Sequence, residues 1–467
     1  MPIFIKTTPR IRLRSFNKES LTFVIDENRT ATFHVQTQQV LTNLLSFIRE
    51  GQSLEILEKQ EKTDASLSRL CLFIEQLKKN GLVEYYFNFN ASENVVVSPK
   101  SLNFKSSTLS PNNMTLKQCP YILSRFAYFR RQDDKMMLEC PLAPFRISLN
   151  TAFFNRLLPY ITGAENLTNY EYKTLQEEKT WRAFISLLIK YKVIHPVQEI
   201  ETENLQFWEF HDLVFHSSSR RGEFDDNVRF GATYRFQEKL SPPLTFKDID
   251  VNSAFELYKP NLDELAISDS PFSRVLESRR SIRGHSDSKK ITLEKLGEFL
   301  YRSIGLREVV KMPIQDAIFR PYPAAGAIHE IDFYLVINVC NGIEPGVYYY
   351  HPVRHTLCKK NVGMSYIEKI ISNAKFGMGV AATAPQIVFV LTSRFKKIAW
   401  KYEKMSYRCT LISMGAIFQT MSLVATSMNL ASCIVGSGDS SLFAEALNID
   451  SLEEGAIGEF TLGVPSD

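Results

Sequence analysis

Three arginines surround a serine in the segment SRRSIRGH, residues 278–285. Arg279, Arg280 and Arg283 place planar guanidinium groups around the hydroxyl of Ser281, within about one and a half turns of a helix. A guanidinium group can donate two parallel hydrogen bonds to phosphate oxygens, so the segment predicts a site for a phosphate and an adjoining ribityl chain. A solvated basic turn at the end of a helix would have the same composition.

A loop of small residues, Pro323, Ala324, Ala325 and Gly326, precedes the strongly apolar run EIDFYLVI. Small residues allow the backbone to approach a flat ring closely, and backbone N–H groups can then meet the polar edge of that ring. The loop therefore indicates a binding surface for a planar group. A tight packing turn explains the same residues equally well.

The stretch 409–438 contains no charged residue. It predicts a long helix, a turn and a short strand that ends at Ile434, Val435 and Gly436. Serine, threonine, glutamine and asparagine residues interrupt the stretch too often for a membrane span. We therefore expect a helix that is buried on nearly all sides, as at the centre of a dimer.

The composition is typical of a soluble globular protein with several domains. The chain has 467 residues, which predicts about three domains, and 44% of them are hydrophobic. The formal net charge of +4 is too small and too dispersed to indicate a nucleic-acid partner. Seven scattered cysteines without a CxxC pair indicate reduced thiols, and the N-terminus does not resemble a signal peptide. We expect a cytoplasmic protein without a membrane or nucleic-acid partner.

The pattern of the N-terminal half predicts two copies of one module, residues 1–105 and 106–205. The segments LFIEQLKKNGLVEYY and AFISLLIKYKVIHPV, about 110 residues apart, each combine a long helix, a turn and an extended apolar strand. Together with the strands and helices before them, they predict tandem winged-helix-like modules. Residues 206–265 read as an irregular connector, and residues 266–467 as an α+β domain without a regular βαβ period. In the first module the predicted helices lie near residues 39–49 and 66–80.

The three motifs, in this order and followed by GEFTLGVP near the end, resemble the nitroreductase-like flavoprotein superfamily over about the last 200 residues. The resemblance implies that Arg279, Ser281 and Arg283 hold the phosphate and ribityl chain of FMN. It implies that residues 434–436 line the flavin ring and that residues 323–326 approach the ring from the partner subunit of an intertwined homodimer. Arg280 and Arg408 are also expected among the cofactor contacts.

The sequence departs from the family pattern at two places. The family loop often reads Pro-Ser-Ala-Gly, whereas Ala324 stands at the position of the serine. Many members carry a lysine or arginine shortly after the final Gly-x-Pro, whereas this sequence ends at Ser466 and Asp467. The first departure removes one hydroxyl contact, and the second assigns more of the phosphate binding to the arginine cluster.

A narrower resemblance is to the azoline dehydrogenases of the streptolysin and cyanobactin type. WEFHDLVFHSSSRRG resembles the connector before their flavin domain, and WKYEKMSYR contains the adjacent pair Lys401 and Tyr402. The N-terminal modules look like winged-helix peptide clamps that hold leader peptides. The resemblance implies FMN-dependent oxidation of thiazoline or oxazoline rings in a heterocyclised precursor peptide, with dioxygen reoxidising the flavin. The clamp modules would hold the peptide by adding a strand to a sheet edge, or would serve dimer packing alone.

Oxidation of an azoline ring removes a hydride and a proton from adjacent carbons, so the enzyme needs a base. A free lysine has a pKa of about 10.4 and is protonated at neutral pH. Burial, or a second cation such as Arg408, would lower the pKa of Lys401 and make it a competent base. Tyr402 would orient the ring or relay the proton. The alternative is that Lys401 is a surface lysine at the start of an amphipathic helix.

Other residues and functions remain as alternatives. His329, His351 and His355 are acid–base candidates by residue type alone, and His211 and His216 lack enough neighbouring ligands to predict a metal site. A generic NAD(P)H-dependent nitroreductase would share the flavin motifs. A redox-sensing DNA-binding regulator would share the winged helices, but the candidate recognition helix has three cations only, namely Arg69, Lys78 and Lys79.

Overall fold

The computed structural model divides the chain into two compact units, Met1–Arg229 and Phe230–Asp467. The division falls inside the segment 206–265 that the sequence assigns to a connector. The described residues are 3–7, 12–16, 20–26, 29–34, 46–47, 51–53, 74–75, 77–78, 82–89, 94–100, 116–220, 233–249, 254–379 and 383–466.

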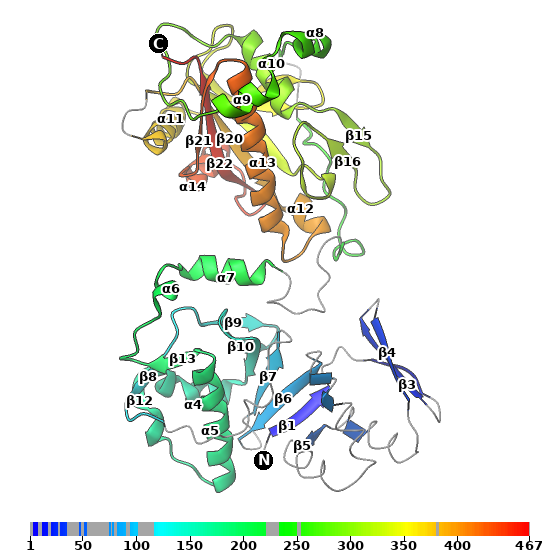
Figure 1. Cartoon of the computed structure of the whole chain (residues 1–467), viewed down its shortest axis with the longest axis vertical. Helices are drawn as coiled ribbons and strands as arrows, with labels where there is room; N and C mark the ends of the chain where they lie inside the picture. The colour runs from blue at the N-terminus through cyan, green and yellow to red at the C-terminus, as the bar shows by residue number, and fades with distance from the viewer. Residues whose placement is uncertain are drawn as a thin grey trace. The chain divides into compact units, whose positions relative to one another are not determined.

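The N-terminal unit is built on one seven-stranded antiparallel sheet (Figure 1). In spatial order its strands are β5 (Gln52–Ser53), β1 (Ile3–Thr7), β6 (Val83–Asn88), β7 (Asn94–Pro99), β11 (Phe145–Leu149), β10 (Lys135–Glu139) and β9 (Tyr128–Gln132). Alternate residues of β6 and β11 are buried, as expected for strands with one face on a core. That core contains Trp181 and Phe184 from α5 (Leu175–Lys190) and Phe153 from α4 (Thr151–Ile161).

The sheet joins strands from both predicted modules, because β7 pairs with β11 in the register Val97 to Ile147. The predicted helices at 39–49 and 66–80 lie largely outside the described residues, so the two winged-helix modules remain a prediction. The remaining elements of the unit are β12 (Thr162–Asn166), β8 (Pro120–Leu123) and β13 (Ile194–Pro196) in one sheet, β2 (Arg12–Phe16), β3 (Ser20–Asp26) and β4 (Arg29–His34) in another, η2 (Leu167–Asn169), α6 (Glu203–Gln206) and α7 (Phe210–Ser218).

The C-terminal unit contains a second seven-stranded sheet whose described pairings are all antiparallel. In spatial order its strands are β14 (Phe255–Glu256), β19 (Thr356–Lys360), β18 (Gly346–His351), β17 (Ile331–Ile337), β20 (Ile387–Arg394), β22 (Glu454–Gly463) and β21 (Ala431–Val435). All seven residues of β17 are buried, because helices cover both faces of the sheet.

Side-chain alternation sends successive strand residues into two different cores. Phe333 and Leu335 pack in the core with α10 (Leu293–Ile304) and α13 (Ser406–Ser427). Tyr334 and Val336 pack in the core with α11 (Met364–Met378) and α14 (Ser440–Leu447). Figure 1 shows α13 crossing the sheet, with α11 and α14 beside β21 and β22.

The predicted uncharged segment forms α13, a turn and β21, and Asn429 in the turn has φ 54°. The described residues contain one helix, α13, that is long and apolar enough to cross a membrane. Core helices of soluble proteins share this length and composition. The other elements of the unit are α8 (Leu262–Ser268), α9 (Phe272–Ser278), β15 (Glu308–Val310), β16 (Ala317–Phe319), η3 (Ala325–Ala327) and α12 (Phe395–Lys401).

Candidate active site

The predicted base and its neighbour meet the predicted loop of small residues. Lys401 is the last residue of α12, and Tyr402 caps that helix. The Nζ atom of Lys401 donates a hydrogen bond of 3.1 Å to the carbonyl of Gly326. A Cβ atom placed on Gly326 would lie 2.6 Å from Lys401 Nζ and 2.7 Å from Tyr402 Oη. The two predicted site residues therefore converge on one glycine of the loop.

The loop has a strained backbone. Gly326, Ala327 and His329 have φ values of 56°, 56° and 49°, in the left-handed region. For residues other than glycine this conformation costs about 1 kcal/mol each, and such strain is common at functional sites. The strain persists only where surrounding contacts hold the backbone in place.

Lys397 supplies such contacts from the same helix as Lys401. Its Nζ atom donates hydrogen bonds of 3.1 Å to the carbonyl of His329 and 2.7 Å to that of Thr245. Residues four apart lie on one face of a helix, so α12 directs two ammonium groups at the strained loop. Lys397 was not among the residues predicted from the sequence, although its spacing from Lys401 could have indicated the shared face.

Burial changes the proton affinity of both lysines. Desolvation lowers the pKa of Lys401, whose side chain is half-buried. Lys397 is only 3% exposed, and burial lowers its pKa to about 7. Burial raises the pKa of Tyr402, which therefore stays protonated and able to donate a hydrogen bond. The site thus combines an amine that loses its proton more readily than usual with a neutral phenol.

Buried polar groups lie directly behind the loop. Burial, together with the charges of Arg320 and Lys397, lowers the pKa of His329 to about 3, so this histidine is neutral at physiological pH. Glu330 is fully buried, and burial raises its pKa, whereas the hydroxyl groups of Thr410 and Ser413 oppose this shift.

Two of the remaining histidines form structural contacts. The Nδ1 atom of His355 lies 2.9 Å from Tyr350 Oη, and its Nε2 atom lies 3.0 Å from the carbonyl of Tyr258. The Nδ1 atom of His351 accepts a hydrogen bond from the backbone of Arg354. Within the described ranges, no group of three His, Cys, Asp or Glu residues could hold a metal ion.

The predicted phosphate-binding cluster occupies the loop that follows α9. Arg279 caps α9, and Arg280, Ser281 and Arg283 are exposed. The backbone N–H of Ile282 donates a 2.9 Å hydrogen bond to the carbonyl of Ser432, which attaches the loop to β21.

The end of β21 presents an open surface next to this loop. The Ile434 side chain is 43% exposed, whereas Val435 is buried. A Cβ atom on Gly436 would meet no other atom within 4 Å. An arginine-rich loop therefore lies beside an open, partly apolar strand end, a combination that suits a phosphate joined to a flat ring.

The predicted residues thus form two groups on different elements. The base group consists of Lys401, Tyr402 and residues 323–326 on η3 and α12, and Arg408 lies close in sequence in the first turn of α13. The cofactor group consists of residues 279–283 and 434–436 on the loop after α9 and on β21. In Figure 1, α9 lies across the upper half of α13 and α12 lies beside its lower end.

Two families of known proteins match different parts of the chain. Residues 276–464 match the family described as "Nitroreductase family", and residues 121–225 match "Cyanobactin oxidase ThcOx". The C-terminal unit therefore has the nitroreductase fold. The resemblance to nitroreductases and cyanobactin-type oxidases that the motifs indicate is confirmed.

Individual relatives agree with these matches. The putative nitroreductase MJ1384 of Methanocaldococcus jannaschii is 26% identical over 202 residues, which cover 43% of this chain and 92% of the relative. The microcin B17-processing protein McbC of Escherichia coli is 22% identical over 199 residues, which cover 42% of this chain and 70% of the relative. The trifolitoxin-processing protein TfxB of Rhizobium leguminosarum bv. trifolii is 29% identical over 143 residues, with 30% and 38% covered.

Two solved structures superpose on part of the chain. A putative nitroreductase from Ralstonia eutropha JMP134 has a TM-score of 0.37 and 18% identity, and covers 51% of this chain and 100% of its own. A chain of the Escherichia coli microcin synthetase McbBCD complex with truncated pro-MccB17 bound has a TM-score of 0.35 and 18% identity, with 58% and 99% covered.

Proposed function

We propose, from the match of residues 276–464 to the nitroreductase family, that this oxidoreductase uses FMN to dehydrogenate thiazoline or oxazoline rings in a heterocyclised precursor peptide, with dioxygen as the final electron acceptor. The observation that carries the proposal is the convergence of Lys401 Nζ and Tyr402 Oη on Gly326. The match of residues 121–225 to a cyanobactin oxidase and the two peptide-processing relatives support an azoline peptide as substrate.

Lys401 has the properties that the proton-abstraction step requires. A bound FMN would supply the hydride acceptor for this reaction. The adjacent ring carbon loses a proton, and Lys401 takes it in its neutral form, which its lowered pKa makes more available. Within the described part of the chain, Lys401 Nζ has one hydrogen-bond acceptor, Gly326 O, and it can exchange this contact for the substrate. Tyr402 remains a phenol and orients the ring through its hydroxyl.

The residues of the cofactor group fit FMN. Arg279, Arg280 and Arg283 would hold the phosphate and Ser281 the ribityl chain, because these side chains are exposed or half-exposed beside β21. Residues 434–436 would line the flavin ring, since Gly436 leaves open space and Ile434 offers an apolar surface.

We further propose that a homodimer completes each site. Helix α13 has no charged residue after its first turn, yet Ile412 is 62% exposed and Gly415 and Gln419 are also exposed. An uncharged helix with an open face is typical of a subunit interface. The base group of one subunit would then meet the cofactor group of its partner, which explains why the two groups occupy different elements.

The N-terminal unit is the proposed holder of the peptide. β13 lies at the edge of the sheet β12-β8-β13 and β9 at the edge of the seven-stranded sheet, and an edge strand can pair with an added peptide strand. We place the reaction in the cytoplasm, where the described cysteines, all of them free thiols, would stay reduced.

The test is mass spectrometry of a thiazoline-containing peptide after aerobic incubation with the full-length protein and FMN, without NAD(P)H. We expect the loss of two hydrogens per ring. Lys401→Ala should slow this loss by about 10²–10⁴-fold while FMN stays bound. Lys396→Ala is the matched control, because Lys396 is an exposed lysine of the same helix, paired with Glu453 at the surface.

Two outcomes would contradict the proposal. An unchanged peptide mass together with rapid bleaching of the flavin by NADPH would indicate a generic nitroreductase. Full activity of Lys401→Ala would show that another group takes the proton.

A further inference from the structure

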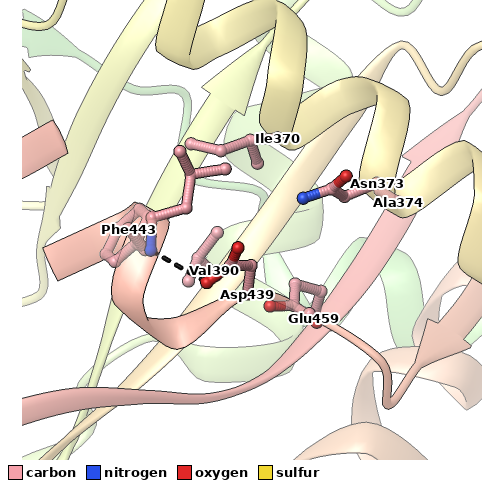
Figure 2. Close-up of a pocket in the computed structure, with 9 residues that line it drawn as sticks. Ile370, Asn373, Ala374, Val390, Asp439, Phe443 and Glu459 are labelled. Carbon is pink, nitrogen blue, oxygen red and sulfur yellow. Dashed lines mark hydrogen bonds between the residues drawn. The ribbon is translucent and has the colours of Figure 1, made fainter. Parts of the chain in front are cut away.

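Glu459 is a carboxylic acid in the interior of the C-terminal sheet. It lies in β22 between Val390 of β20 and Val435 of β21, and it is only 6% exposed. Figure 2 shows its side chain in a small pocket under α11 and α14. The pocket is lined by Ile370, Asn373, Ala374, Val390, Gly438, Asp439, Leu442, Phe443 and Glu459. A charge in such surroundings is costly, so this residue requires an explanation.

The carboxyl group lies directly beneath Gly438. A Cβ atom on Gly438 would overlap the carboxyl group of Glu459. The backbone can therefore pass over Glu459 only because residue 438 is a glycine. The Gly438 backbone N–H favours the charged form of the carboxyl group, whereas Oε2 has no hydrogen-bond partner among the described residues. The contact therefore joins Glu459 to the middle of the loop 436–439.

The same loop carries part of the proposed flavin surface. It begins at Gly436, at the open end of β21, and ends at Asp439, which caps α14. The Oδ1 atom of Asp439 accepts a 2.9 Å hydrogen bond from the Leu442 N–H, and its carbonyl accepts one of 3.2 Å from the Phe443 N–H (Figure 2). Helix α14 thus fixes one end of the loop, and Glu459 supports its centre.

Few groups near Glu459 can compensate a charge. Burial raises the pKa of Glu459 to about 7, the Gly438 N–H opposes this shift, and the negative charge of Asp439 adds to it. Asp439 is the second titratable group among the residues that line the pocket. The lining residues from α11, α14 and β20 are otherwise apolar, apart from the amide of Asn373.

We propose that Glu459 is a positioning residue whose protonation holds the loop 436–439 in the conformation that binds the flavin. In its neutral form the carboxyl group stays packed beneath Gly438. When it ionises, repulsion from Asp439 and the demand for water displace the loop, and the hold on the flavin weakens. The identity of the ligand as FMN rests on the proposed function, whereas the proposed movement of the loop is independent of that function. The ionisation of Glu459 and the displacement of the loop centre near pH 7.

The first test measures FMN affinity of the full-length protein by fluorescence across the range from about pH 5 to about pH 9. We expect the wild-type affinity to fall about three- to tenfold as pH rises through 7. Glu459→Gln cannot ionise and should show no such step. Asp439→Asn removes the neighbouring charge but keeps a good helix cap, so the step should move to lower pH. Identical pH profiles for the wild type and Glu459→Gln would overturn the proposal.

The second test measures amide hydrogen exchange of the loop 436–439 in the flavin-free full-length protein. Relative to Glu459→Gln at the same pH, the wild-type loop should exchange equally slowly below pH 7 and faster above it. Equal exchange at every pH would overturn the loop movement. If neither protein binds FMN at any pH, the proposed cofactor is wrong, and this second measurement alone decides the role of Glu459.

Discussion

Lys397 and Lys401 lie one turn apart on α12, and their surroundings assign them different tasks. Lys397 is buried and bound to two carbonyls, so its movement would leave polar groups unpaired in the interior. Lys401 is half-buried and, in the described ranges, bound to one carbonyl. The cost of releasing Lys401 toward a substrate is therefore smaller. We infer that Lys397 holds the loop and that Lys401 is free to react.

Replacement of Gly326 tests the closeness of this arrangement. A side chain at this position would displace Lys401 Nζ and Tyr402 Oη, which lie 2.6 Å and 2.7 Å from an added Cβ. We expect Gly326→Ala to lower kcat for ring dehydrogenation by about tenfold or more. Gly326→Asn is the matched variant, because asparagine tolerates the left-handed backbone but keeps the steric conflict. Recovery of kcat in Gly326→Asn would show that backbone strain, and not the lost position of the lysine, causes the defect.

The buried carboxyl group of Glu459 also predicts a pH-dependent stability. Its pKa is raised from 4.5 to about 7 on folding, so the unfolded chain ionises first and stability falls as pH rises from about 4.5 to 7. The shift corresponds to a loss of about 3 kcal/mol above pH 7. We expect the thermal unfolding midpoint of Glu459→Gln, measured relative to that of the wild type, to rise between pH 5 and pH 8. A constant difference in midpoint would contradict the raised pKa.

At the scale of elements, the apolar patterns of the sequence predicted helices and strands, whereas the polar patterns predicted candidate site residues only. The run IDFYLVI became a fully buried strand, as its apolar composition predicted. The uncharged stretch 409–438 became α13, a turn and β21, but α13 is not buried on nearly all sides, because Ile412, Gly415 and Gln419 are exposed. The small-residue loop and the pair Lys401–Tyr402 were identified, and the structure brings them together. Their roles in catalysis stay predictions.

The rest depended on long-range packing that local patterns do not encode. The order of the strands and the pairing of β7 with β11 join segments far apart in the chain. Lys397 and Glu459 belong to residue types that are usually exposed, so their burial was not expected. The left-handed backbone of Ala327 and His329 could not be foreseen, because residues other than glycine rarely adopt it.

The open face of α13 leads to a prediction about assembly. Ile412→Glu places a charge on the uncharged stripe that we assign to the subunit interface. We expect the variant to shift toward monomer in analytical ultracentrifugation and to lose FMN, because in the proposed dimer each flavin is bound by both subunits. Leu452→Glu is the control, since Leu452 is 84% exposed in a turn outside α13. A dimeric Ile412→Glu protein with normal FMN content would place the interface elsewhere.

At the scale of the whole molecule, the proposed function assigns peptide holding to one unit and the chemistry to the other. The N-terminal unit has its own core and sheet edges, and the C-terminal unit carries both groups of predicted site residues. These two groups lie on different elements of one subunit, and in the proposed dimer each site takes one group from each subunit. A shared site would make dimer formation a condition for activity.

Hybrid dimers provide a direct test of this division. One subunit carries Arg283→Ala and the other Lys401→Ala, and two affinity tags allow purification of the hybrid alone. If each site combines the cofactor group of one subunit with the base group of its partner, one of the two sites is intact. We then expect about half of the wild-type rate per dimer, although each parent homodimer is nearly inactive. The reciprocal hybrid carries both substitutions in one subunit beside a wild-type partner. Shared sites make this hybrid inactive, whereas sites within single subunits would leave it half-active and the first hybrid inactive.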